Sequence, residues 1–204
     1  NLMPVTINGG GSIEGLSVGG LGSGVVNTAT LANGAASGSK LTMPIGSIIQ
    51  TKQIYRTSQF SQSLTTGNFS DAVMTLSITP SSSSNKILVL CTVHISTGSA
   101  TNGAQALLKR DGTPIGIADA DGSRARATGA GMGSAAVSRM QSNVQMTFLD
   151  SPSSTSALSY TAHIKPGYAG TQTVYLNREG AGHSTNNSNI GLSASSLTLM
   201  EVKA

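Results

Sequence analysis

The sequence predicts an all-β protein, and three observations support this. Charged residues make up only 10 % and apolar residues 38 % of the 204 residues. So few charges exclude a long solvated helical bundle, which needs Glu and Lys on its outer faces. They also differ from the high net charge of ordinary disordered chains. Ser, Thr, Gly and Asn fill the difference, and together with Val, Ile and Leu they favour strands and turns.

From residue 44 onward, β-forming segments alternate with turn signals. Apolar residues alternate along 144–148 and again along 160–164, so each segment has one apolar face. Asp111-Gly112 is a strong signal for a hairpin turn. The predicted strands are Ser47–Thr57, Ala72–Thr79, Lys86–Thr97, Ala104–Arg110, Val144–Leu149, Ala157–Lys165, Thr173–Arg178 and Leu192–Val202, with short pieces near Gln59–Leu64 and Pro114–Ile117.

Eight or more strands with no long helix predict a sandwich or barrel, and a jelly-roll-like β-sandwich fits the strand number. Two longer segments, Ala118–Asn143 and Glu179–Gly191, interrupt the strands and are predicted to be loops. Loops of this length in a compact domain tend to be functional.

The first 43 residues differ from the rest in being rich in glycine. A helix is disfavoured there, because each interior Gly costs about 1 kcal/mol relative to Ala. Apolar residues nevertheless recur in this segment at a spacing of five positions. A single extended chain could not bury them, whereas three chains wound together could bury them on a common axis. We therefore expect residues 1–43 to form a short extended stalk in a homotrimer and residues 44–204 to form the β-sandwich head. A flexible tether with accidental spacing is the alternative. The apolar residues that recur every five positions are Leu16, Leu21, Val26, Leu31, Ala36 and Leu41.

The candidates for chemistry are few. Cys91, the only cysteine, lies in a strongly β-forming run and is interpreted as a buried free thiol. His94, His163 and His183 lie far apart in the sequence, and His163 is expected at a solvated strand position. No metal-protease, paired-cysteine or phosphate-loop motif occurs. The sequence therefore predicts a protein that is not an enzyme and has no cofactor.

Asp119-Ala-Asp-Gly122 admits three interpretations. The two aspartates could form a turn with Arg124 or Arg126, start a calcium loop, or act as the carboxylate pair of a glycoside hydrolase. The remaining calcium ligands are missing, so no metal site is predicted. Sugar hydrolases also use aromatic platforms, whereas aromatic residues total 3 % here and Trp is absent. The turn is the favoured interpretation.

The formal net charge is +4, but the basic residues are scattered and no aromatic residues lie between them. This pattern does not favour nucleic-acid binding. The longest apolar stretch, Ile87–Cys91, is far too short to span a bilayer, so no membrane insertion is predicted. No signal peptide is recognisable, which suggests export by assembly into a particle released by lysis. The chain begins at Asn1, as a processed form or a piece of a longer polypeptide would.

Several short sequence segments within residues 44–204 resemble segments of tail-fibre-like structural proteins of tailed bacteriophages. Val25–Ala35 (VVNTATLANGA) is also similar to the short repeats of phage fibre shafts. The resemblance implies a trimeric virion protein with a head akin to tumour-necrosis-factor-like jelly rolls, bound to other virion proteins through its N-terminal segment. The segments within residues 44–204 are Gly46–Gln50 (GSIIQ), Leu108–Gly116 (LKRDGTPIG), Ile117–Arg126 (IADADGSRAR), Phe148–Tyr160 (FLDSPSSTSALSY) and Leu197–Val202 (LTLMEV).

Three functions remain open. The first is a tail fibre or fibre tip that binds a host surface polysaccharide or protein. The second is a capsid decoration protein or head fibre, and the third, less favoured, is a polysaccharide depolymerase. The sequence does not encode the location on the virion, tail or capsid.

If the head binds a host, we expect the contacts in the two long loops. Arginines could engage anionic polysaccharide, and asparagine amides could bond sugar hydroxyls. The alternative is that Arg124 and Arg126 pair with the nearby aspartates and that the Asn-rich loop is solvated. The candidate receptor-binding residues are Arg124, Arg126, Arg139, Asn186, Asn187 and Asn189.

Overall fold

The computed structural model describes residues 6–7, 13–14, 43–65, 67–98, 103–131, 141–167, 170–180, 188 and 191–204. The chain divides into two units, Asn1–Met43 and Pro44–Ala204. In the first unit the backbone of β1 (Thr6–Ile7) pairs antiparallel with β2 (Ile13–Glu14). The predicted stalk residues Leu16, Leu21, Val26, Leu31 and Leu41 lie outside the described residues, so the trimeric stalk stays a prediction.

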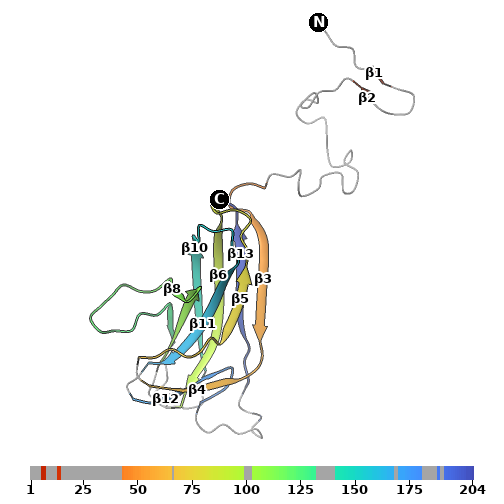
Figure 1. Cartoon of the computed structure of the whole chain (residues 1–204). Helices are drawn as coiled ribbons and strands as arrows, with labels where there is room; N and C mark the ends of the chain where they lie inside the picture. Colours follow the sequence, from red (N-terminus) through yellow and green to blue (C-terminus); the bar gives the residue numbers. More distant parts are fainter. Residues whose placement is uncertain are drawn as a thin grey trace. The chain divides into compact units, whose positions relative to one another are not determined.

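The second unit is built of strands, and no described segment of it is helical (Figure 1). Every predicted strand is present, within three residues of its predicted ends, and the two short pieces are strands as well. The strands are β3 (Ile48–Arg56), β4 (Phe60–Leu64), β5 (Met74–Ile78), β6 (Lys86–Thr97), β7 (Ala104–Arg110), β8 (Thr113–Ile115), β9 (Gly129–Gly131), β10 (Ser142–Asp150), β11 (Leu158–Pro166), β12 (Gln172–Leu176) and β13 (Ser195–Val202).

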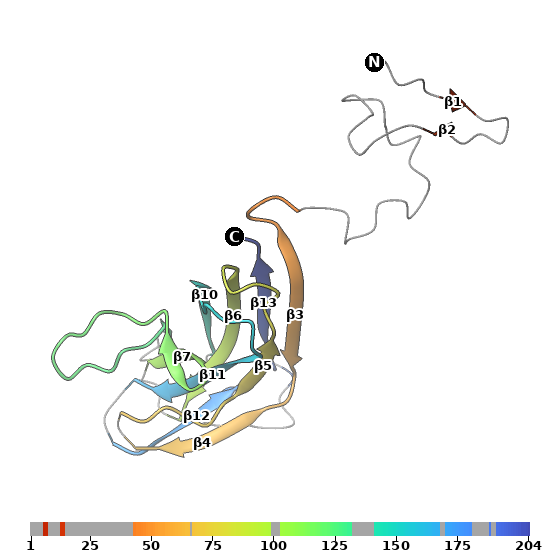
Figure 2. The same ribbon diagram turned by 45° about the horizontal axis from the view of Figure 1, so that its top comes forward.

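These strands form two antiparallel sheets that pack as a sandwich (Figure 2). The β6 sheet has the order β3-β13-β6, with β10 on the other side of β6 and with β12 and β4 continuing from the end of β6. The β7 sheet has the order β5-β11-β7, with β8 and β9 pairing to β7. The predicted all-β sandwich is therefore confirmed.

The pairings are nested around one central turn. β7 pairs with β8 and β9, β6 with β10, β5 with β11, β4 with β12, and β3 with β13. The second unit is thus one long antiparallel hairpin, and its successive strand pairs are distributed between two sheets. Rolling up such a hairpin gives a jelly roll.

The central turn is the predicted one at Asp111-Gly112. Both residues have positive φ, 47° and 82°, as a type I′ hairpin turn requires. The Asp111 carboxylate also accepts a hydrogen bond from the backbone N–H of Ser159, at 2.8 Å. This bond ties the turn to β11, beside which β7 lies.

Aliphatic side chains fill the space between the sheets, and the alternation along 144–148 and 160–164 gives the two predicted apolar faces. Cys91 lies among them with 2 % of its surface exposed. Burial raises the pKa of its thiol to about 12. The interpretation as a buried free thiol is confirmed.

A buried ionic cluster joins the two sheets. Arg110 of β7 donates to both carboxylate oxygens of Asp150 of β10 at 2.7 Å, and the Tyr160 hydroxyl of β11 donates to the same carboxylate at 2.7 Å. Asp150 is 5 % exposed and Tyr160 is fully buried. Burial and the hydrogen bond to Asp150 raise the pKa of Tyr160. We call Arg110, Asp150 and Tyr160 the inter-sheet clamp.

The prediction of one uninterrupted loop over Ala118–Asn143 was wrong. Gly129–Gly131 forms β9 and pairs with β7, and β10 begins at Ser142. A strand this rich in glycine gives no β signal in the sequence. Glycine is nevertheless required, because a Cβ atom at Gly129 or Gly131 would lie within 2.9 Å of side-chain atoms of β10.

The prediction of a solvated His163 was also wrong, since only 9 % of it is exposed. The segment between β4 and β5 covers this position, and Nδ1 donates to the Ser70 carbonyl at 2.8 Å. Nε2 lies 2.9 Å from the Thr161 hydroxyl, so both ring nitrogens of the neutral form are bonded. Burial lowers the pKa of His163; the hydrogen bond to Ser70 is the larger of two opposing effects, nearby Lys109 lowers the pKa further, and Asp71 raises it slightly.

Candidate functional site

One loop, residues 116–128, leaves the sandwich between β8 and β9 (Figure 1, green). Every side chain from Ala118 to Arg126 is exposed. Two of the predicted receptor-binding residues, Arg124 and Arg126, lie on it. We call residues 116–128 the projecting loop.

The base of the projecting loop is fixed by one threonine and one glycine. The Thr128 hydroxyl donates to the Ile115 carbonyl at 2.9 Å and accepts from the Leu108 N–H at 3.0 Å. Gly116, with φ of 59°, packs against Phe148 so closely that a Cβ atom would lie 3.0 Å from the ring. The two ends of the loop are therefore held against β7 and β10.

The tip is held by its own charged residues. Arg126 Nε donates to the Ala118 carbonyl at 2.6 Å, and the Ala118 N–H donates to Ala127 across the loop at 3.3 Å. A turn follows, in which the Arg124 N–H donates to the Asp121 carbonyl at 3.2 Å and the two side chains form an ion pair at 3.0 Å. The turn interpretation of this segment is thus confirmed for Asp121 and Arg124, whereas Arg126 bonds a backbone carbonyl instead.

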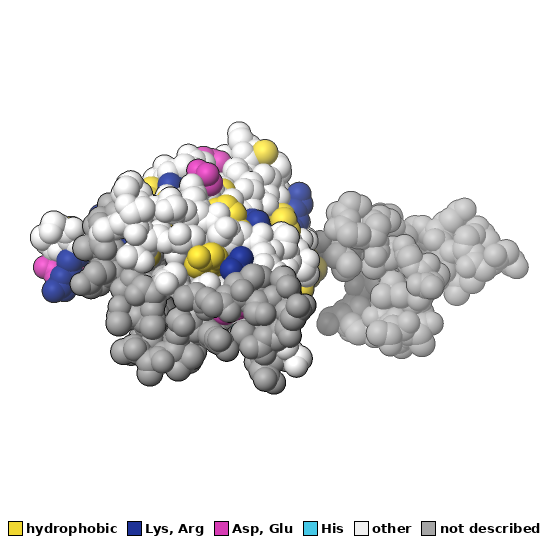
Figure 3. All heavy atoms as spheres, turned by 90° about the horizontal axis from the view of Figure 1, so that it is seen from below, with side chains coloured by type: hydrophobic (Ala, Val, Ile, Leu, Met, Phe, Trp, Pro, Cys, Tyr) yellow, Lys and Arg dark blue, Asp and Glu magenta, His cyan; other side chains and the backbone are white. Residues whose placement is uncertain are grey.

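The ion pair at the tip lies in solvent, because the Arg124 and Asp121 side chains are 83 % and 73 % exposed. Basic and acidic side chains meet at the left edge of the space-filling view, while most of the surface beside them is uncharged (Figure 3). Such a pair is weak and is easily exchanged for a ligand carboxylate, phosphate or sulfate. The tip can therefore offer guanidinium groups to an anionic ligand.

The other predicted recognition residues, Arg139, Asn186, Asn187 and Asn189, lie outside the described residues. Of the second predicted loop, Glu179 and Gly180 at its start are buried and Gly191 at its end is exposed. Of the six candidates, Arg124 and Arg126 are described, and both lie on the projecting loop.

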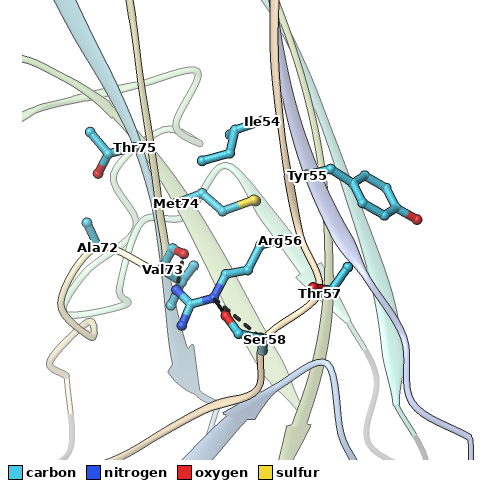
Figure 4. A pocket seen from close by; sticks show the side chains of 9 residues that line it. All are labelled: Ile54, Tyr55, Arg56, Thr57, Ser58, Ala72, Val73, Met74 and Thr75. Atoms are coloured by element: carbon cyan, nitrogen blue, oxygen red, sulfur yellow. Dashed lines mark hydrogen bonds between the residues drawn. The ribbon is translucent and has the colours of Figure 1, made fainter.

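A pocket of about 480 Å³ lies at the edge of the sandwich between β3 and β5 (Figure 4). Arg56, its one ionic lining residue, donates to the Val73 carbonyl and, at 3.1 Å, to the Ser58 hydroxyl. The remaining lining residues are Ile54, Tyr55, Thr57, Ala72, Met74 and Thr75. The pocket lining holds no carboxylate, imidazole or thiol for general acid–base or nucleophilic chemistry.

Within the described ranges, no three His, Cys, Asp or Glu side chains gather in a way that could hold a metal ion. His94 lies near the end of β6, and partial burial lowers its pKa. The same ranges contain no helix long and apolar enough to cross a membrane.

Comparison with known proteins returned structural neighbours alone. No protein-family model and no curated protein matches the sequence. A structure of infectious bursal disease virus, Gt strain, aligns with 78 % of this chain at 18 % identity and a TM-score of 0.42. The VP2 subviral particle of that virus aligns at 13 % identity with a TM-score of 0.38, again over 78 % of this chain. The chain spans about two fifths of the length of these proteins, 39 % in both comparisons.

Proposed function

We propose that this protein is a non-enzymatic structural subunit of a virion surface, a homotrimeric tail fibre or fibre tip that attaches to the host. The observation that carries the proposal is the projecting loop, an exposed and internally braced segment on a closed jelly-roll framework. Binding loops are commonly arranged in this way, since the strands are committed to the sheets while a loop can vary without unfolding the domain. The sequence segments that resemble those of phage fibre proteins support the same function.

The ligand chemistry proposed for the loop is an anionic surface polysaccharide. The Arg124 guanidinium is exposed and is held only by a surface ion pair with Asp121. A planar guanidinium bonds carboxylate or sulfate groups in bidentate fashion. A trimer presents the loop three times, so weak single contacts combine into useful avidity.

A capsid decoration protein or head fibre is the second candidate, and the charge balance of the loop favours it. Asp119 and Asp121 offset Arg124 and Arg126, so the projecting loop has no net charge. A neutral, self-paired loop exerts no net attraction on an anionic ligand, as expected of a loop that is merely solvated. On this alternative the head decorates the shell and the N-terminal segment anchors it.

The test combines location with binding. Antibodies against residues 44–204 would label the tail in electron micrographs of the virion if the first candidate is right, and the capsid if the second is right. Purified full-length protein should bind host cells, and Arg124→Ala/Arg126→Ala should bind less than a control with Lys52→Ala, an exposed residue of β3. Absence of the protein from virions would overturn both candidates, and binding equal in all three proteins would remove the loop as the contact.

A further inference from the structure

The outer face of the β6 sheet is uncovered by any described segment and almost uncharged. On β13, Leu197 and Leu199 point into the sandwich, so the residues that alternate with them point outward; these are Ser196, Thr198, Met200 and Val202. The outward positions of β3, β13, β6 and β10 hold Ser, Thr, Asn, Gln, Tyr and aliphatic residues, and His94 at the end of the face away from Lys86. Lys86, at one end of β6, is the one Lys, Arg, Asp or Glu among them.

Apolar side chains form a contiguous patch at one end of this face. Met200 lies opposite Leu88, and Leu88 lies opposite Leu149, so the three form a row across β13, β6 and β10. Ile48 is 51 % exposed and Leu149 46 % exposed, although both are large aliphatic residues. We call Ile48, Leu88, Leu90, Leu149, Met200 and Val202 the apolar patch.

The outer face of the β7 sheet differs in both respects. Phe69 packs over Lys165, with the ammonium 5.5 Å from the ring centre, and Ser70 bonds His163. The protein's own chain thus covers part of that face, which also carries Lys109. The described part of the chain therefore leaves the outer face of the β6 sheet open to a partner.

Charge and composition indicate a second copy of the chain as that partner. Two copies of a protein with net charge +4 repel one another, so they approach most easily where charge is absent. An apolar centre surrounded by uncharged polar residues is the composition of a subunit interface core, from which charged residues are depleted. Four strands about 4.8 Å apart and about eight residues long make a face of roughly 500 Å² in projection, of the same order as the roughly 800 Å² per partner in stable interfaces.

We propose that the outer face of the β6 sheet, centred on the apolar patch, is the surface through which copies of the head associate. The proposal rests on the homotrimer of the proposed function and deepens it, since this face of each head then lies toward the three-fold axis and meets both neighbours, as a ring of three requires. The β7 sheet, and with it the projecting loop, then faces away from the contact.

The test is the mass of the full-length protein by light scattering as a function of concentration. The parent should give three times the 20.5 kDa chain mass. Leu149→Asp/Met200→Asp should raise the concentration at half-assembly by about 100-fold, because a charge is buried at the centre of each contact. Thr75→Asp/Ser77→Asp, exposed positions on β5 of the other sheet, is the matched control and should assemble like the parent.

A second measurement tests the patch without the aspartate variant, so it does not depend on that variant being folded. A nitroxide label on Thr147→Cys, which lies beside the patch on β10, should report short distances between labels in the assembled parent. A label on Ser77→Cys should report long distances. Buried Cys91 does not compete for the label.

The outcomes separate the patch from the function. An oligomer that survives Leu149→Asp/Met200→Asp, or long distances from Thr147→Cys, overturns the patch and leaves the proposed virion subunit standing. A parent that stays monomeric at micromolar concentration overturns the patch and the trimer together. Labelling of the virion in micrographs is unaffected by either result and tests the virion location by itself.

Discussion

Two Asp–Arg pairs of this protein have the same chemistry and opposite surroundings. In the inter-sheet clamp, the Arg110 and Asp150 side chains are 26 % and 6 % exposed, and a buried tyrosine adds a third bond. In the projecting loop, Arg124 and Asp121 are almost fully in water. Burial, rather than the pairing of charges, therefore decides whether such a pair stabilises the fold or is available to a ligand.

The largest expected effect is on the clamp. Asp150→Ala leaves Arg110 and the Tyr160 hydroxyl without their shared partner between the sheets, so the free energy of unfolding should fall by roughly 3–5 kcal/mol. Urea denaturation followed by circular dichroism measures the loss, with Asp121→Ala as the control. A loss equal in the two variants would contradict the distinction between the pairs.

Tyr160→Phe should have a smaller effect in the same direction. It removes one hydrogen bond to a carboxylate and keeps the ring in the core, so we expect a loss of about 1.5–3 kcal/mol. Tyr55→Phe, at a residue that is 65 % exposed, is the matched control and should change stability by less than about 0.5 kcal/mol. Equal stability of the two variants would mean that the tyrosine hydroxyl adds nothing to the clamp.

Acid should weaken the buried polar sites in two steps. Burial lowers the pKa of His163 below 6.5, so the unfolded chain takes up the proton first and stability falls as the pH drops below 6.5. Burial alone would raise the pKa of Glu201, but hydrogen bonds from Asn85 and Ser81 lower it below 4.5. The stability that this carboxylate contributes is present above pH 4.5 and is lost below it.

Urea melts of His163→Gln at pH 7, 6 and 5 would isolate the first step. The variant should lose less stability than the parent between pH 7 and 5. His94→Gln is the comparison variant. Partial burial lowers the pKa of His94 too, so this variant should relieve part of the loss, but less of it than His163→Gln, whose imidazole is more deeply buried. A parent as stable at pH 5 as at pH 7 would contradict the role given to His163.

The smallest effect on stability is expected at the exposed pair. Arg124→Ala should change the free energy of unfolding by less than about 0.5 kcal/mol, since exposed ion pairs contribute little. Differential scanning calorimetry of the variant beside the parent measures it. A loss near that of Asp150→Ala would show that the loop is part of the folding unit rather than a recognition element.

The sequence predicted the strands well because their signals are local. Lys86–Thr97 and Ala104–Arg110 match the structure residue for residue, since β-branched residues, alternation and the Asp-Gly turn agree over these stretches. β9 and the burial of His163 were missed because both arise from contacts distant in sequence. A glycine strand forms where β10 approaches closely, and Ser70 covers a histidine 93 positions away.

The candidate site was predictable in part. The turn at Asp121 and Arg124 follows from residues three positions apart, whereas closure of the loop by Thr128 depends on Ile115 and Leu108, to which no sequence pattern pointed. The apolar patch had a signal in the run Ile87–Cys91. That run is apolar at odd and even positions alike, as in a strand that is covered on both faces.

The nesting of the strands also sets an order for synthesis. The outermost strand pair is β3 with β13, in which Ile48 lies opposite Val202. β3 therefore has no partner until almost the whole head has been synthesised. At roughly 5–20 residues per second, the ribosome needs on the order of 10–30 seconds for that stretch. During this interval the backbone N–H and C=O groups of β3, beside the apolar Ile48 and Ile49, have no strand to pair with, which is a hazard for aggregation. Yield in a recombinant host should therefore depend on translation speed and on chaperones that shield the newly made β3.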